Sequence, residues 1–247
     1  MAERETIVCQ DVVELSRQSA QCFSHLARQS VEVSGCFTVA LSGGSTPKHL
    51  YSLLASPGYK ERVPWKSVHL FWGDERCVPP DHAGSNFRMV QESLLSKIDI
   101  PPENIHRMAG EREPQAAAAE YEKNLQEFFG LENAALPRFD LILLGIGEDG
   151  HTASLFPGSD ALSETKRLVA APYVEKLNSY RLTLTLPVLN NGAEVWFLVT
   201  GNGKAEAVKE VFSGSSDLPA AKVQPIDGKL TWFITEDAAA GLSAGGK

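Results

Sequence analysis

The sequence predicts an α/β sandwich, in which helices pack against a mostly parallel β-sheet. Short apolar segments of strand length recur along the chain, and segments with helical periodicity separate them, which is the alternation typical of this fold class. The length of 247 residues is enough to bury a sizeable core and allows one large domain or two small ones. Because the Pro-, Gly- and Ser-containing linkers are all short, we expect a single domain over residues 1–247.

Five apolar segments are expected to form the buried strands. Each is too short for a typical helix and is apolar on nearly every residue, as strands covered on both faces are. Most of them are rich in β-branched or aromatic residues. They are Cys36–Leu41, Val68–Trp72, Phe139–Leu144, Glu194–Val199 and Leu230–Ile234.

Helical patterns lie between these strands. The first runs from Asp11 to about Ser30, where apolar residues recur at helical spacing. The second begins at Pro47, since a missing N–H costs nothing in a first helical turn, and runs to Leu54. Further helices are predicted at Asn86–Leu95, Pro114–Phe129 and Lys204–Phe212, and across the alanine-rich end.

The composition is that of an ordinary folded protein, with 43% apolar and 22% charged residues, which argues against disorder. The 31 Asp and Glu residues outnumber the 23 Lys and Arg residues, which gives a net charge of −8. This acidic balance argues against nucleic acid or an anionic membrane as a partner, because either needs a basic face. An anionic ligand would have to be attracted by a local site.

The sequence favours a cytoplasmic protein that holds no metal. No apolar run approaches the roughly 18 residues of a membrane-spanning helix, and the charged start lacks the apolar core of a signal peptide. The four cysteines form no C-x-x-C pair and are expected to stay reduced. No spacing of cysteine and histidine indicates a metal site.

Glycine-rich and polar segments follow the first four predicted strands. In open α/β sheets, ligands bind beyond the carboxyl ends of the strands, so we expect these segments to line one site. They are Ser42–Pro47, Gly73–Arg76, Gly145–His151 and Thr200–Lys204.

The first of these segments, Ser42–Pro47, is suited to bind a phosphate group. Gly43 and Gly44 let the backbone approach a ligand closely, and Ser45 or Thr46 would cap the helix that follows. Such a turn directs several N–H groups and the positive end of a helix at one point. A plain capped turn is the alternative. The segment lacks the lysine of G-x-x-x-x-G-K-[ST], which argues against nucleoside triphosphate binding.

Several charged residues near this edge are candidates to hold an anion. Arg76 could clamp a phosphate in a bidentate way, and Asp74 could orient Arg76 or sugar hydroxyls, although a surface ion-pair turn is equally compatible. Lys204 opens a predicted helix close to the same crevice, where the alternative is a solvated lysine. Arg88 and Arg181 are further cations whose position the sequence does not fix.

The segment Gly145–Gly150 contains a G-x-G-x-x-G pattern, but dinucleotide binding is disfavoured. Glu148 and Asp149 would place two carboxylates against a pyrophosphate, and little helix can follow the turn. His151, beside Asp149, is placed to act as a general base with a pKa near neutrality. The alternative is a structural histidine.

A serine hydrolase is a weaker interpretation. The segment Ala40–Gly44 is one residue short of the G-x-S-x-G nucleophile elbow, which would require an acid and then a late histidine in the chain. The last histidine is His151, and Asp149 lies only two residues before it.

Together these segments resemble the 6-phosphogluconolactonase family. The matching segments occur in order through nearly the whole chain, and the stretch Gly-His-Thr-Ala-Ser-Leu-Phe-Pro is highly specific. They are Leu41–Pro47, Phe71–Pro79, Gly147–Pro157, Arg181–Pro187, Gly201–Lys204 and Val223–Phe233. The resemblance implies a Rossmann-like fold with a mostly parallel sheet and helices on both faces, in three layers.

The resemblance also implies an activity: hydrolysis of 6-phospho-D-glucono-1,5-lactone to 6-phospho-D-gluconate, a step of the oxidative pentose phosphate pathway, without a cofactor. The family's histidine falls on His151, its phosphate-binding cations on Arg76 and Lys204, and its phosphate loop on residues 42–46. We expect a sugar-phosphate lactone as the small-molecule partner and a monomer or weak homo-oligomer. Arg88 or Arg181 would assist in phosphate binding.

In the implied mechanism, His151 takes a proton from the attacking water. Glycine amides of residues 145–150 are expected to stabilise the tetrahedral oxyanion. Asp149 would either orient His151 or only cap the turn.

Two rival functions are less well supported by the sequence. Glucosamine-6-phosphate deaminases share a similar glycine loop and Asp-Gly-His turn, but they carry a glutamate where Phe156 stands and a tyrosine where Arg76 stands. A phenylalanine cannot relay a proton. A regulator that binds a sugar phosphate without turnover would normally carry a DNA-binding appendage, and neither a helix–turn–helix nor a basic patch is evident.

Overall fold

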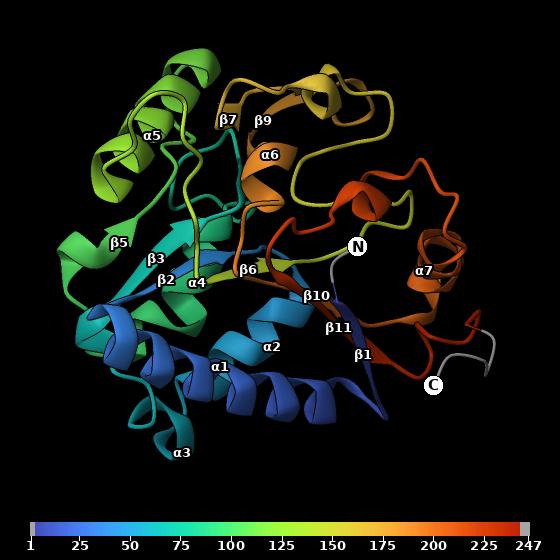
Figure 1. Cartoon of the computed structure of the whole chain (residues 1–247), viewed down its shortest axis with the longest axis horizontal. Helices are drawn as coiled ribbons and strands as arrows, with labels where there is room; N and C mark the ends of the chain where they lie inside the picture. Colours follow the sequence, from blue (N-terminus) through green and yellow to red (C-terminus); the bar gives the residue numbers. More distant parts are fainter. Residues whose placement is uncertain (1–2, 243–247) are drawn as a thin grey trace.

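A seven-stranded sheet, in which all neighbouring strands are parallel, forms the centre of the protein (Figure 1). The structure is a computed structural model and describes residues 3–242. The strand order is β1-β11-β10-β6-β2-β3-β5. The bounds are β1 Glu3–Cys9, β2 Phe37–Leu41, β3 Val68–Trp72, β5 Ile105–His106, β6 Leu141–Leu144, β10 Glu194–Val199 and β11 Lys229–Thr235.

Helices cover both faces of this sheet, which confirms the predicted layered α/β fold. In Figure 1, α1 and α2 lie below the sheet, whereas α5 and α6 lie above it. The helices are α1 Val12–Ser34, α2 Ser45–Leu54, α3 Pro57–Lys60, α4 Asn86–Ser93, α5 Pro114–Phe129, α6 Leu186–Leu189 and α7 Ala205–Phe212. The longest, α1, begins where the Asp11 carboxylate accepts two backbone N–H bonds, a cap worth about 1 kcal/mol, and ends at Gly35 with a φ of 84°.

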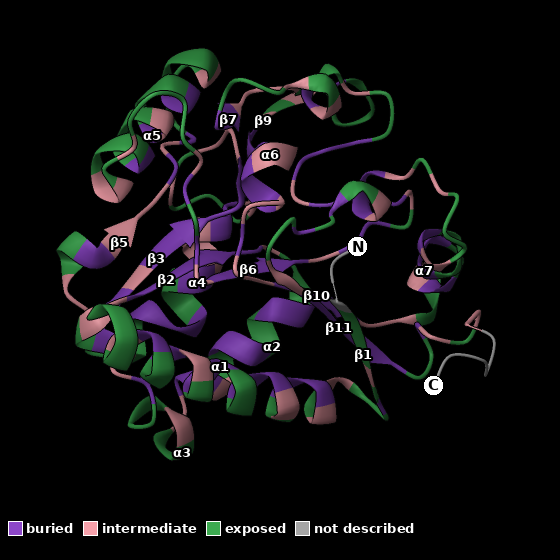
Figure 2. Ribbon diagram, in the orientation of Figure 1, coloured by how far each residue is buried: buried purple, intermediate pink, exposed green. Residues whose placement is uncertain are grey.

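The predicted strands are buried because their side chains pack on helices from both sides. Every residue of β2 and β6 is buried, as the purple arrows of Figure 2 show. Aromatic rings fill the space under the right-hand helix α7. There Trp232 stacks on Phe197 at a centroid distance of 3.9 Å and meets Phe212 edge-on at 5.2 Å. This burial is what the uninterrupted apolar runs predict.

A second, smaller sheet sits beside the main one and was not predicted. Its strands are antiparallel, in the order β4 (Asp74–Arg76), β9 (Ser179–Leu184) and β7 (Val169–Ala170), with β8 (Tyr173–Val174) also paired to β9. The N–H of Leu184 donates to the carbonyl of Gly73 at 2.8 Å, just beyond the end of β3. This sheet therefore brings residues near 181 to the carboxyl edge of the main sheet.

Two further predictions about secondary structure were incomplete or wrong. The strands β1 and β5 went unpredicted because β1 begins with the three charged residues Glu3–Glu5 and β5 has only two residues. The helix predicted across the alanine-rich end is wrong for the described residues, where 236–241 form turns. Asp237 explains this, since its carboxylate accepts from Thr235 Oγ1 at 2.5 Å and Ala238 N at 2.8 Å, bonds typical of a turn.

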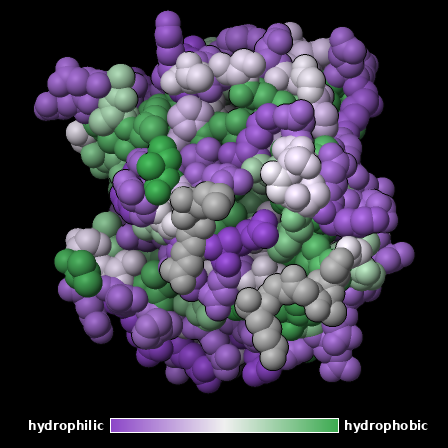
Figure 3. All heavy atoms as spheres, turned by 45° about the vertical axis from the view of Figure 1, so that its right-hand side comes forward, coloured by the Kyte–Doolittle hydropathy of each residue, from purple (hydrophilic) through white to green (hydrophobic). Residues whose placement is uncertain are grey.

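None of the helices among residues 3–242 combines the length and hydrophobicity that crossing a bilayer requires. Figure 3, which brings the side of α7 forward, shows hydrophilic side chains interrupted by separate hydrophobic patches.

Candidate active site

The four polar segments predicted to line one site meet at the carboxyl edge of the main sheet. The hydroxyls of Thr46 and Thr200, which follow β2 and β10, lie 2.7 Å apart. Ser154, just past the turn that follows β6, donates its hydroxyl to the Asp74 carboxylate at 2.7 Å. These contacts connect the ends of four different strands, so the side chains they carry face a common region.

The segment after β2 presents backbone amides at the start of a helix. Gly44, with a φ of 104°, is the N-cap residue of α2, and the helix begins at Ser45. The expectation that Ser45 or Thr46 caps a helix starting at Pro47 was therefore wrong by two residues, because Gly44 makes the turn. The amides of a first helical turn have no acceptor within the helix and can bind an anion.

Packing holds this segment from two directions. The buried Tyr51 hydroxyl accepts from the N–H of Ser42 at 3.0 Å and donates to its carbonyl at 2.9 Å. The Asn86 amide lies so close to Gly43 that a β-carbon there would overlap it, which explains the glycine. Asn86 in turn donates to the Asp74 carbonyl at 3.0 Å. The segment is thus fixed relative to β4.

The acidic residues of β4 have structural partners. Asp74 is 8% exposed, and its carboxylate accepts from Ser154 and, at 3.3 Å, from Asn86. Glu75 accepts three backbone N–H bonds of 2.7 Å each, from Arg76, Asn86 and Phe87. Burial raises the pKa of Glu75, although these hydrogen bonds oppose the shift. Both carboxylates therefore fix the local structure around Arg76.

Three cations from three elements lie close enough to His151 to act on its charge. Arg76 in β4 is the direct neighbour of Arg181 in β9 in the antiparallel register. Lys204 closes the short 3₁₀ turn Asn202–Lys204 that precedes α7. Burial lowers the pKa of Arg181, and Arg76 lowers it further. Within residues 3–242, none of the three forms an ion pair with a carboxylate within 4.0 Å.

His151 follows the glycine turn after β6, and contacts hold its ring on several sides. The carboxylate of Asp149 accepts a hydrogen bond from ring nitrogen Nδ1. The phenyl ring of Phe156 stacks on the imidazole at a centroid distance of 4.2 Å and 27°. A β-carbon at Gly147 would overlap the imidazole, so only glycine permits this approach. The side chain is 31% exposed. Because Asp149 is bonded to Nδ1, Nε2 is the ring nitrogen that Asp149 does not engage.

The environment lowers the pKa of His151 to about 4, so the predicted pKa near neutrality was wrong. Burial is the largest cause, and the positive charges of Lys204, Arg76 and Arg181 add to it, whereas Asp74 opposes it. The imidazole is accordingly neutral at physiological pH. A neutral imidazole with a free Nε2 can accept a proton.

A known family matches most of the chain. The family described as glucosamine-6-phosphate isomerases/6-phosphogluconolactonase matches residues 10–232. The chain belongs to this family. The resemblance found in the sequence is thereby confirmed.

Known proteins are similar to this chain over most of its length. It is 43% identical to a 6-phosphogluconolactonase of Nostoc, over 86% of each chain, and 41% identical to one of Synechocystis, over 92% of this chain and 94% of that one. Its fold resembles the solved structure of 6-phosphogluconolactonase from Trypanosoma brucei, with a TM-score of 0.88, 26% identity, and coverage of 98% of this chain and 100% of that chain.

Two groups predicted for the site have other partners in the structure. The guanidinium of Arg88 pairs with Glu92 at 2.7 Å and donates to the Asp81 carbonyl at 2.8 Å. The glycine amides expected to stabilise an oxyanion are partly occupied. Gly147 donates to the His151 carbonyl at 2.8 Å, and Gly150 donates to the carbonyl of Gly147 at 3.0 Å. These two amides maintain the turn instead.

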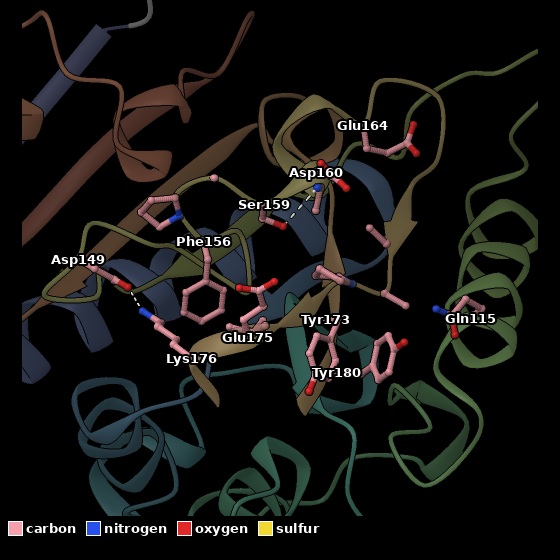
Figure 4. A pocket seen from close by; sticks show the side chains of 17 residues that line it. Gln115, Asp149, Phe156, Ser159, Asp160, Glu164, Tyr173, Glu175, Lys176 and Tyr180 are labelled. Carbon is pink, nitrogen blue, oxygen red and sulfur yellow. Dashed lines mark hydrogen bonds and ion pairs between the residues drawn. The ribbon is translucent and has the colours of Figure 1, made fainter. Parts of the chain in front are cut away.

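A residue absent from the sequence predictions, Lys176, also reaches the site. A cleft of about 990 Å³ is lined by Lys176, the segment around Tyr173, and Asp149 and Phe156, the two residues that contact the His151 ring (Figure 4). Lys176 pairs with Asp149 from a segment 27 positions further along the chain. Its neighbours in sequence form no pattern that marks a site. Only the pairing of β8 with β9 reveals its position.

Proposed function

We propose that the chain hydrolyses 6-phospho-D-glucono-1,5-lactone to 6-phospho-D-gluconate in the oxidative pentose phosphate pathway. The observation that carries this proposal is the arrangement of a neutral, carboxylate-held imidazole at His151 facing three cations without carboxylate partners. Such a site combines a base with an anion anchor. The names of the relatives that are 43% and 41% identical support the same substrate.

The phosphate group of the substrate would be bound at the start of α2. The amides of residues 43–46 would donate to it, whereas the N–H of Ser42, expected to do the same, already donates to the Tyr51 hydroxyl. Arg181, Arg76 and Lys204 supply positive charge. Each hydrogen bond between charged groups contributes about 1.5–3 kcal/mol. Binding the phosphate at one end fixes the position of the lactone carbonyl at the other, which contributes to rate by proximity.

His151 would act as the general base and then as the general acid. Its Nε2 takes a proton from water while the water oxygen bonds to C1 of the lactone, and the carbonyl π electrons move to the carbonyl oxygen. The tetrahedral intermediate collapses, the bond from C1 to the ring oxygen breaks, and the imidazolium returns its proton to that oxygen. Proton transfer of this kind contributes about 10²–10⁴-fold.

Asp149 would keep the imidazole in the reactive tautomer. Its carboxylate accepts from Nδ1, which places the ring proton there and leaves the lone pair on Nε2. It also stabilises the imidazolium that forms during the reaction.

The site argues against the deaminase reaction of the other branch of the family. The position at which the sequence comparison expects a proton-relaying glutamate is Phe156, and its ring stacks on His151 at 4.2 Å. A phenyl ring neither accepts nor donates a proton. Ring opening of an amino sugar would lack this carboxylate.

The proposal includes no metal and no cofactor, since the carbonyl carbon of a lactone is itself electrophilic. The predicted cytoplasmic location is supported by the cysteines, because all four are free thiols among residues 3–242, as is usual in a reducing compartment. A monomer or weak homo-oligomer is part of the same proposal.

The decisive experiment supplies freshly generated 6-phosphogluconolactone and follows its loss against the uncatalysed rate, for the δ- and γ-lactones separately. We expect accelerated loss of the δ-lactone and much weaker turnover of gluconolactone without the phosphate. Ammonia release from glucosamine 6-phosphate is measured in parallel. Ammonia release without lactone loss would overturn the proposal in favour of the deaminase.

A further inference from the structure

Lys176 contacts both groups that hold the His151 imidazole. It lies in the 3₁₀ turn Glu175–Leu177 between β8 and β9. Its ammonium pairs with Oδ2 of Asp149, the carboxylate whose Oδ1 accepts from His151. The same ammonium lies 4.5 Å from the ring centroid of Phe156, which stacks on His151. Figure 4 shows Lys176 between Asp149 and Phe156.

This arrangement restricts the Asp149 carboxylate. The Oδ1 atom of Asp149 accepts from His151 Nδ1 and, at 3.2 Å, from the His151 backbone N–H, and Lys176 adds a partner on Oδ2. A carboxylate with partners on one oxygen only can still rotate about its χ2 bond, whereas one with a partner on each oxygen has a single favourable orientation. The side chains of Asp149 and Lys176 are 33% and 51% exposed, so solvent weakens their attraction but does not remove the geometric restriction. The orientation of Asp149 sets the plane of the imidazole, because Nδ1 donates to it.

Several contacts hold the segment that carries Lys176. Tyr173 and Tyr180 are paired across β8 and β9, and their rings meet edge-on at 5.0 Å. The turn between the strands closes at Asn178, whose φ is 46°, and the Tyr173 hydroxyl donates to its side chain. The strand that leaves this turn carries Arg181 to the cation cluster. One hairpin thus connects the imidazole contacts to the anion anchor.

We propose that Lys176 is a positioning residue for His151, which it holds through Asp149 and Phe156. This inference rests on the proposed role of His151 as the general base. Lys176 does not touch the reacting atoms. It keeps Nε2 directed at the substrate, and it balances the negative charge of Asp149 so that this carboxylate orients the imidazole without making it strongly basic.

The charges around His151 define what the loss of Lys176 should change. Asp149 faces the ring from its own turn, Asp74 and Arg76 act from β4, Arg181 from β9, and Lys204 from the turn before α7. Without Lys176, the carboxylate at Nδ1 has no cation on its second oxygen. The imidazolium is then more stable, and the pKa of His151 should rise from its lowered value.

The experiment compares Lys176→Met, Lys176→Arg and a matched control, Lys123→Met. Lys123 also forms an exposed ion pair, with Glu127 at 3.4 Å, but on the surface of α5. We expect Lys176→Met to lower kcat about 10- to 100-fold with little change in KM. The acid limb of kcat/KM should move up by about one pH unit. Lys176→Arg, which can bind the same carboxylate, should recover most of kcat, and Lys123→Met should match the parent.

An NMR titration of the His151 imidazole tests the inference separately from the activity. A rise in the pKa of His151 in Lys176→Met supports the coupling even if the lactone proves to be the wrong substrate. Unchanged kcat, pH profile and His151 titration in Lys176→Met would overturn the inference, as would an equal loss in Lys123→Met. If Lys176→Met does not fold, Lys176→Gln serves in its place. Normal turnover by a His151→Gln variant would instead overturn the proposed function.

Discussion

Two histidines in this protein have similar immediate surroundings but differ in the chemistry that their imidazoles can perform. His106 and His151 each stack on a phenylalanine at a centroid distance of 4.2 Å, on Phe71 and Phe156 respectively. The pKa of each is lowered to about 4, with burial as the largest cause. The partner at a ring nitrogen differs. His106 Nε2 lies 3.2 Å from a second imidazole, that of His69, whereas His151 Nδ1 donates to a carboxylate.

The comparison shows that a lowered pKa alone does not identify a catalytic residue. The region around His106 is an aromatic cluster, in which Phe71 and Phe128 surround the imidazoles of His106 and His69. Among residues 3–242, no carboxylate is bonded to either of these two rings. Desolvation keeps His106 neutral, but nothing there orients a substrate. At His151 the same desolvation is combined with a carboxylate bonded to the ring and with three cations that we propose to bind an anion.

The largest expected difference between the two regions is in turnover. Replacing His151 by Gln removes the base, so we expect kcat to fall about 10²–10⁴-fold with KM nearly unchanged. Replacing His106 by Gln should leave kcat at the parent value. Steady-state kinetics on fresh lactone measures both. Comparable losses in the two variants would show that His151 acts only through folding.

The cations near His151, which have no counterpart near His106, should control binding of the substrate. Arg181→Ala and Lys204→Ala each remove a charged partner of the phosphate, worth about 1.5–3 kcal/mol, so KM should rise about 10- to 100-fold. kcat should change less. Arg112→Ala, which removes a cation paired with Glu120 on the surface, is the matched control. Equal turnover of phosphorylated and unphosphorylated lactone by the parent enzyme would contradict the anchor.

The two histidines should contribute alike to acid instability and differently to activity. An unfolded histidine titrates near 6.5, whereas both folded groups titrate near 4, so the unfolded state binds more protons between these values. The free energy of unfolding should therefore fall as the pH decreases from about 6.5 to about 4. Denaturant titrations across this range should show a weaker decrease in His106→Gln.

The pH dependence of activity separates the two groups. The acid limb of kcat/KM should lie near pH 4, where His151 becomes protonated, and it should be the same in His106→Gln as in the parent. A limb near pH 6.5 in the parent would contradict the burial of His151.

The smallest expected effects come from the two stacked phenylalanines. Each stacking contact contributes about 0.5–1.5 kcal/mol. Phe156→Leu should lower kcat about 2- to 10-fold, since it loosens both His151 and Lys176. Phe71→Leu should instead lower the melting temperature without changing kcat. Thermal unfolding and kinetics on the same two samples distinguish the cases.

The frame of the fold was predictable because burial on both sides of a parallel sheet leaves uninterrupted apolar runs. Val68–Trp72 and Glu194–Val199 were predicted with the bounds that the structure has. The small antiparallel sheet was not. Three of its strands have only two or three residues and carry no readable periodicity, and its six-residue strand β9 has nothing to pair with until those short strands are placed. Strand β1, at the edge of the sheet, was hidden by its charged start.

The candidate site was predictable to the extent that it follows strand ends. Glycine-rich segments after four apolar runs had to converge, and His151 and Lys204 could be assigned to them directly. The position of Arg181 depends on its register with Arg76 in the unpredicted sheet. The lowered pKa of His151 depends on distances to groups far along the chain, which no local pattern contains. Lys176 was missed for the same reason.

The hydroxyl contact between Thr46 and Thr200 leaves one proton uncommitted. Each hydroxyl carries a single hydrogen, either oxygen can be the donor across their 2.7 Å separation, and one bond uses only one of the two hydrogens. The remaining hydrogen belongs to Thr46 or Thr200 according to the direction of the bond. A phosphate oxygen arriving beside either residue can therefore receive it after a simple rotation of the pair, with no change in net charge.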